Sequence, residues 1–182
     1  LIGAYTSNSE TTVIMTTHDM NQGRRLADTI AIIMDGNVIQ ADTPNNVFNM
    51  PNSMEVANFV GTENVLEGTI ISSDDGIATV QVGERVVEVI SDREIGSNVY
   101  VCIRPEEITI SLAQSTTSSA RNTYAAQIEG IIYNHPLAHV VVNCGFDLTV
   151  FVTARSANEL GFAKGNQVMV SFKATGVHII AR

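Results

Sequence analysis

The sequence predicts a mainly β protein in which two small barrels follow a short α/β segment. Three observations support this fold class. Apolar and polar residues alternate along residues 64–112 and 120–182, which is typical of strands with one buried face. These two stretches also match each other at several positions, as repeated β units do. Residues 1–61 instead mix the signals of strands, helices and turns.

Composition limits the classes of protein to consider. The 182 residues are 45% hydrophobic and 16% charged, which is ordinary for a globular chain and argues against disorder. The net charge of −9 and the lack of tryptophan argue against a nucleic-acid partner. No apolar run approaches the roughly 20 residues that cross a bilayer, and the first residues do not resemble a signal peptide. Cys102 and Cys144 are expected to be buried thiols in a reducing cytoplasm.

The first segment begins with strand, helix and hairpin signals. The apolar run 12–16 predicts a buried strand, and a helix is expected through residues 24–28. The dipeptide Asp35-Gly36 separates two apolar stretches and predicts a tight hairpin, because these residues tolerate positive φ.

Two helix starts follow the hairpin. Thr43 and Pro44 fit the N-cap and first position of a helix that reaches about Asn49. Ser53 is expected to cap a second helix that runs to Val60. Together with the preceding signals, these elements predict an incomplete piece of an α/β domain.

The two β stretches predict an internal duplication. Leu66-Glu67-Gly68 resembles Ile128-Glu129-Gly130 at an offset of 62 residues. Seven extra residues within 154–164 then raise the offset to 69, which matches Val101 with Val170. Two units of short strands fit a pair of OB-like barrels.

The expected domain limits are 1–63, 64–114 and 115–182. A polar run at 114–119 is typical of a linker, and the charge changes there. Residues 1–115 hold five basic and sixteen acidic side chains, whereas residues 116–182 hold five basic and three acidic ones. This contrast predicts an anionic ligand in the last third, or it reflects chance variation between small domains.

Differences between the copies concentrate hydrogen-bond donors in the second copy. The insertion predicts a short helix that begins around Thr153-Ala154-Arg155-Ser156, where free N–H groups favour anions. Arg104-Pro105-Glu106-Glu107 becomes Lys173-Ala174-Thr175-Gly176, which removes two carboxylates and restores backbone donors. At the offset of 62, residues 57–60 of the first copy correspond to Ser119-Ala120-Arg121-Asn122 of the second. Such donors suit a small tetrahedral oxyanion, although similar clusters also cap helices or line rims.

Three motifs of the second copy resemble the molbindin-like (Mop) domain, a small β-barrel that binds molybdate or tungstate. They are Ser119-Ala120-Arg121-Asn122, Thr153-Ala154-Arg155-Ser156-Ala157 and Phe172-Lys173-Ala174-Thr175, and the resemblance covers residues 118–182. In that family the oxyanion lies between Mop units, often from different subunits. The resemblance implies these oxyanion-binding residues: Ser119, Arg121, Thr153, Ser156, Lys173, the Ala174 backbone and Thr175. The family more often has serine at the last of these positions, and threonine keeps the hydroxyl.

Residues 11–61 resemble the end of the nucleotide-binding domain of ABC importers, most closely the tungstate-importer branch. The resemblance rests on Thr12-Val13-Ile14-Met15-Thr16-Thr17-His18-Asp19, on residues 26–36 and on Gly61-Thr62-Glu63-Asn64. Residues 101–107 resemble the tail strand of the accessory barrel in such subunits.

The resemblance implies that His18 is the switch histidine, which contacts the ATP γ-phosphate and helps to arrange the attacking water in the complete protein. Phosphoryl transfer also needs a phosphate loop, Mg²⁺ ligands and a carboxylate that positions water. The sequence lacks the Walker A, signature and Walker B segments, so we expect no ATP hydrolysis by this chain alone. For the complete protein the resemblance implies ATP and Mg²⁺ as cofactors, a membrane permease subunit as partner and a place at the cytoplasmic face of the membrane.

These resemblances lead to one hypothesis and three alternatives. The chain is expected to be the C-terminal regulatory part of the ATP-binding subunit of a tungstate/molybdate importer. Its Mop-like barrel would bind the oxyanion, form a homodimer and feed back on transport. The alternatives are a ligand-free dimerisation barrel of another importer ATPase, a storage or transcription-factor Mop protein, and an OB-fold nucleic-acid module. A metal centre is not expected, because His135, His139 and His178 lack metal-ligand spacing with either cysteine.

Overall fold

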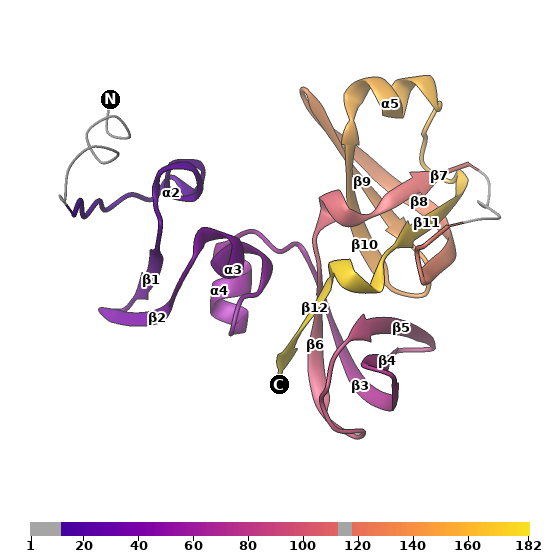
Figure 1. Cartoon of the computed structure of the whole chain (residues 1–182). Coiled ribbons are helices and arrows are strands. Elements are labelled where there is room, and N and C mark those ends of the chain that lie inside the picture. Colours follow the sequence, from indigo (N-terminus) through magenta and orange to yellow (C-terminus); the bar gives the residue numbers. More distant parts are fainter. Residues whose placement is uncertain (1–11, 113–117) are drawn as a thin grey trace. The chain divides into compact units, whose positions relative to one another are not determined.

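The computed structural model describes residues 12–112 and 118–182 (Figure 1). The chain divides into two compact units, Leu1–Gly61 and Thr62–Arg182. The expected domain limit at 114/115 falls outside the described residues.

Within residues 12–61, the first unit is a hairpin with three short helices. Its turn at Asp35 and Gly36 has φ values of 49° and 77°, so the left-handed turn expected from this dipeptide is confirmed. Ile32, Val47 and Val56 are buried together and form its small core. The elements are α2 (Met20–Leu26), β1 (Ile30–Met34), β2 (Asn37–Asp42), α3 (Pro44–Asn49) and α4 (Met54–Phe59).

Side-chain caps set the starts of these helices. The Thr43 and Ser53 hydroxyls each accept a hydrogen bond at 3.3 Å from a backbone N–H three residues on, as expected from the sequence. Asp19 caps α2 by accepting from Asn21 N at 2.9 Å, so the helix begins at Met20. It ends at Leu26, because the next residue is extended, and the expectation of a helix to residue 28 was therefore wrong at this end.

The expected strand at residues 12–16 does not form. These residues have no strand assignment, and the side chains of Val13 and Ile14 are 51% and 90% exposed. Among the described residues, β1 and β2 pair only with each other, so no neighbouring strand accepts the hydrogen bonds of residues 12–16. An apolar β-rich run becomes a buried strand only where a sheet receives it.

The second unit contains two five-stranded antiparallel sheets, with orders β12-β6-β3-β4-β5 and β10-β9-β8-β11-β7. Buried side chains alternate with partly exposed ones along most strands, as in β4, so each sheet has one buried face. The prediction of a mainly β, OB-like architecture is confirmed. The elements of the first sequence copy are β3 (Asn64–Asp74), β4 (Ile77–Val82), β5 (Arg85–Ile90), β6 (Asn98–Ile103), η1 (Pro105–Glu107) and β7 (Thr109–Ser111). Those of the second copy are β8 (Asn122–Asn134), β9 (Leu137–Asn143), β10 (Asp147–Thr153), α5 (Ala154–Glu159), β11 (Gln167–Phe172), η2 (Ala174–Gly176) and β12 (Val177–Ala181).

The two copies exchange their last strands. β7 of the first copy pairs with β11, where Ile110 lies opposite Val170. β12 of the second copy pairs with β6, where Ile179 lies opposite Val101. The short turns η1 and η2 carry the chain from one sheet to the other. Each sheet is therefore completed by the other copy.

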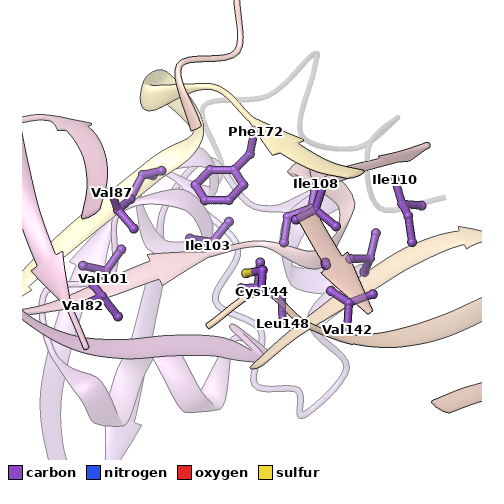
Figure 2. Packing of buried hydrophobic residues seen from close by; sticks show 14 of the residues in the cluster. Val82, Val87, Val101, Ile103, Ile108, Ile110, Val142, Cys144, Leu148 and Phe172 are labelled. Carbon is purple, nitrogen blue, oxygen red and sulfur yellow. The ribbon is translucent and has the colours of Figure 1, made fainter. Parts of the chain in front are cut away.

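The exchange gives the two sheets one continuous hydrophobic core. Figure 2 shows side chains from both sheets in this core, with Val87 and Ile103 from one sheet near Phe172 and Leu148 from the other. All four are no more than 2% exposed. The barrels thus depend on a shared interior.

The register of the duplication differs from the expected one. Leu66 pairs with Val101, and Tyr124 pairs with Val170. Because Val101 and Val170 are equivalent, Leu66 corresponds to Tyr124, and the match with Ile128 was wrong. The second copy has four more residues in its first hairpin, since Ile70 pairs ten residues on and Ile128 pairs fourteen residues on. The offset of 62 therefore holds only beyond that hairpin.

Two buried asparagines bind the sheets to each other in equivalent ways. Asn64 donates to Thr149 O at 2.9 Å and accepts from Thr149 N at 2.6 Å. Asn122 donates to Glu88 O at 2.9 Å and accepts from Glu88 N at 2.8 Å. Each asparagine starts the long strand of its copy and satisfies the backbone of the other copy's third strand. These clamps support the corrected register.

Candidate anion-binding site

The first set of expected ligands lies where β8 begins and β11 ends. Asn122 of β8 pairs with Phe172 of β11, so Arg121 and Lys173 lie next to this pair at the same end of the sheet. Both of these cationic residues are exposed. We call the expected ligands at this end the Arg121 group: Ser119, Arg121, Lys173, Ala174 and Thr175.

Neighbouring contacts fix the backbone of this group. Asn122 clamps the backbone of Glu88, as described above, and Tyr124 donates its hydroxyl to Val86 O at 2.7 Å. Burial raises the pKa of Tyr124 well above its ordinary value, so the phenol remains a donor. Arg121 therefore starts from a strand that is attached to β5 of the other sheet.

The second set consists of Thr153 and Ser156, which we call the Thr153 group. Thr153 ends β10 and is the N-cap of α5, where its Oγ1 accepts from Ser156 N at 3.0 Å. The two hydroxyl oxygens are 2.7 Å apart. One hydroxyl proton lies between them, so the pair retains one proton for a ligand. The expected short helix with glycine after its end is confirmed, because Gly161 follows α5 with φ of 63°.

Within one chain, the structure does not bring the two groups together. Thr153 lies opposite Leu137, and Leu137 lies opposite Asn134, the last residue of β8. The Arg121 group lies at the first residue of β8, and this strand has 13 residues. At roughly 3.3 Å per residue, the two ends are on the order of 40 Å apart along the strand. In Figure 1, α5 and the turn that leads into β12 lie at different ends of this sheet.

Two carboxylates near the Arg121 group were missed in the sequence. Glu88 Oε2 lies 3.4 Å from Arg121 Nε. The Glu107 side chain lies against Gly176 of η2, where an added Cβ would meet Glu107 Oε2 at 3.2 Å. No local sequence signal identifies either one, because both come from the first copy. Glu88 reaches this end through the contact of β5 with Asn122, and Glu107 reaches it through the turn η1.

The corrected register makes the difference between the copies sharper. Ser119-Ala120-Arg121-Asn122 corresponds to Gly61-Thr62-Glu63-Asn64, so Glu63 occupies the place of Arg121. Arg104, the counterpart of Lys173, forms an ion pair with Glu106 at 2.9 Å. The first copy therefore carries acidic residues where the second copy carries donors.

The cysteines and His18 lie outside the Arg121 and Thr153 groups. Among the described residues, no group of three or more His, Cys, Asp or Glu side chains could hold a metal ion. Burial raises the pKa of Cys102 to about 12, and burial also raises the pKa of Cys144, so both free thiols stay protonated. His18 is exposed just before the Asp19 cap of α2.

Comparison with known families matches the second copy to the TOBE domain. The TOBE family model matches residues 118–179. The described residues include no helix that is long and apolar enough to cross a membrane.

The chain is homologous to the C-terminal region of molybdate/tungstate import ATP-binding proteins. It is 36% identical over 169 residues to WtpC of Pyrococcus horikoshii and 31% identical over 169 residues to WtpC of Pyrococcus abyssi. Each alignment covers 92% of the chain and 47% of the relative, so the chain spans about half the length of these curated relatives.

A solved structure has a similar fold. The cytoplasmic molybdate-binding protein ModG, in a form with molybdate bound, superposes with a TM-score of 0.60 and 20% sequence identity. The match covers 67% of this chain and 98% of that one. At this identity the likeness establishes the fold of the two barrels.

Proposed function

We propose that this chain is the C-terminal regulatory part of the ATP-binding subunit of a molybdate/tungstate importer, and that its second barrel binds the oxyanion. One observation carries the proposal: equivalent ends of the two barrels differ in charge. The second copy has Arg121, Lys173 and Thr175 where the first has Glu63, Arg104 and Glu106. Cations and hydroxyls together suit a small dianion, which accepts hydrogen bonds at every oxygen.

The ligand set is complete only when two chains meet. One chain supplies positive charge from Arg121 and Lys173 and a hydroxyl from Thr175. Ala174 of the same chain adds a backbone N–H at the start of a turn. The Thr153 group at the other end of the sheet supplies the remaining hydroxyl proton. Two chains with antiparallel β8 strands would bring the Arg121 group of one chain to the Thr153 group of the other. This arrangement gives two sites per homodimer.

The outer face of the β8-β9-β10 sheet supports this pairing. Ile132, His139 and Phe151 lie opposite one another across the three strands, and we call them the outer row. The His139 and Phe151 rings stack with centroids 4.0 Å apart, and Ile132 is 59% exposed. The next row on this face contains Leu137 and Thr153. A second chain would therefore bury the outer row while it completes the oxyanion site.

The shared site makes feedback possible. An oxyanion that contacts both chains binds the homodimer more tightly than it binds a single chain. A rising oxyanion concentration therefore favours dimer formation. In the complete subunit this would favour one arrangement of the two ATP-binding domains. His18 would act there with ATP and Mg²⁺, beside a membrane permease at the cytoplasmic face of the membrane.

Calorimetric titration with tungstate, molybdate, sulfate and phosphate tests the proposal. We expect heats for tungstate and molybdate that are lost in the Arg121→Ala/Lys173→Ala double variant, and sedimentation should show that tungstate increases the dimer fraction. Equal heats for all four anions, or none, would contradict the proposal.

A ligand-free dimerisation barrel is the second candidate. It is favoured by Glu88 and Glu107, because carboxylates beside a site oppose anion binding. In that case the double variant would dimerise as the unmodified chain does, and tungstate would leave the dimer fraction unchanged in both.

A further inference from the structure

Glu88 reaches the Arg121 group from the other sheet. It lies in β5, and its backbone N and O are both held by Asn122, the residue after Arg121. Asn122 is only 2% exposed, so this attachment is protected from water. The backbones of Glu88 and Arg121 are therefore held close together before any ligand arrives.

The Glu88 carboxylate pairs with the cation of the site. Glu88 Oε2 lies 3.4 Å from Arg121 Nε, and the two side chains are 35% and 62% exposed. The equivalent clamp of the first copy has no such pair, because Asn64 holds Thr149 and Glu63 precedes it. The ion pair is thus a property of the donor-rich end rather than of the clamp itself.

We propose that Glu88 competes with the oxyanion for Arg121 and thereby raises the oxyanion concentration at which the site fills. The inference rests on the proposed function and adds what sets the oxyanion affinity of the site. An incoming dianion must share or replace the Glu88 contact, and it also meets the repulsion of the nearby carboxylate. Because both groups are partly solvated, the competition is modest and screened by salt.

The test compares Glu88→Gln with the unmodified chain by calorimetric titration of tungstate. The amide is nearly the same size and has no charge, so we expect affinity to rise about two- to five-fold, the range that exposed ion pairs usually contribute. The gain should shrink as NaCl is raised from low to high concentration, a change that a purely structural effect would not show.

Glu67→Gln is the matched control. Glu67 pairs with Arg182 at 3.0 Å, so this variant makes the same charge change and also removes an ion pair of the second unit. We expect it to leave tungstate affinity unchanged. Glu88→Asp, which shortens the side chain by one methylene, is a second test and should give a smaller gain.

The outcomes separate the inference from the proposed function. If the unmodified chain binds tungstate and Glu88→Gln binds it equally or more weakly, the inference falls and the proposed function stands. A gain that is unchanged by salt, or that Glu67→Gln reproduces, also overturns the inference. If neither the unmodified chain nor Glu88→Gln binds tungstate, both the inference and the proposed function fail.

Discussion

Two asparagine side chains hold backbone groups that neither sheet can satisfy alone. Asn64 and Asn122 are 3% and 2% exposed, and each bonds both polar groups of a residue in the other sheet. No sequence pattern marks them, because an asparagine at the start of a strand usually reads as a turn residue. Their role follows from the contact between strands far apart in the chain, and so does the contact of Arg121 with Glu88.

Replacing Asn122 by alanine should destabilise the protein by about 2 kcal/mol or more, because it leaves the N–H and C=O of Glu88 without protein partners. Denaturant unfolding measures this change. Asn64→Ala should behave similarly, whereas Gln127→Ala, at an exposed position, should change stability by less than about 0.5 kcal/mol. Equal stability of Asn122→Ala and Gln127→Ala would show that the clamp is not needed.

The elements divide into those predictable from local signals and those that depend on partners. The Asp35-Gly36 hairpin and the caps of α3, α4 and α5 follow from backbone preferences and short-range hydrogen bonds, so the sequence predicts them. The run 12–16 fails as a strand because no described strand pairs with it. Alternating apolar residues identify β7 and β12 as half-buried strands, but they do not indicate which sheet receives them. The exchange therefore had to come from the structure.

The cap of α5 also tests the site. Thr153→Val keeps the side-chain shape but removes the hydroxyl that accepts from Ser156 N, which should lower stability by about 1 kcal/mol. It should also weaken tungstate binding, because the hydroxyl pair of the Thr153 group is lost. Thermal unfolding and calorimetry measure the two effects.

Thr153→Ser retains the hydroxyl and is the control for both measurements. It should unfold and bind tungstate as the unmodified chain does. Tungstate affinity that is unaltered in Thr153→Val would exclude this helix start from the site.

At the scale of the whole molecule, the proposed ligand set requires a second chain. Ile132→Glu places a charge in the outer row without disturbing the monomer, since this side chain is 59% exposed. We expect sedimentation to show a monomer in tungstate, with oxyanion affinity reduced at least tenfold. Ile95→Glu is the matched control, because Ile95 is 63% exposed and lies outside the outer row.

A dimer that survives Ile132→Glu would place the contact elsewhere on the chain. A monomer that binds tungstate with full affinity would mean that one copy supplies every ligand, which the separation of the Arg121 and Thr153 groups along β8 argues against.

The reciprocal crossing of β7 and β12 also limits how this molecule can be divided. A fragment that begins near residue 118 would retain the donor-bearing segments, yet β12 would lack β6 and β11 would lack β7 along one edge. Such a fragment would expose two unpaired strand borders, which readily recruit strands from neighbouring chains. The smallest part that can be separated with its sheets complete therefore contains both barrels, Thr62–Arg182.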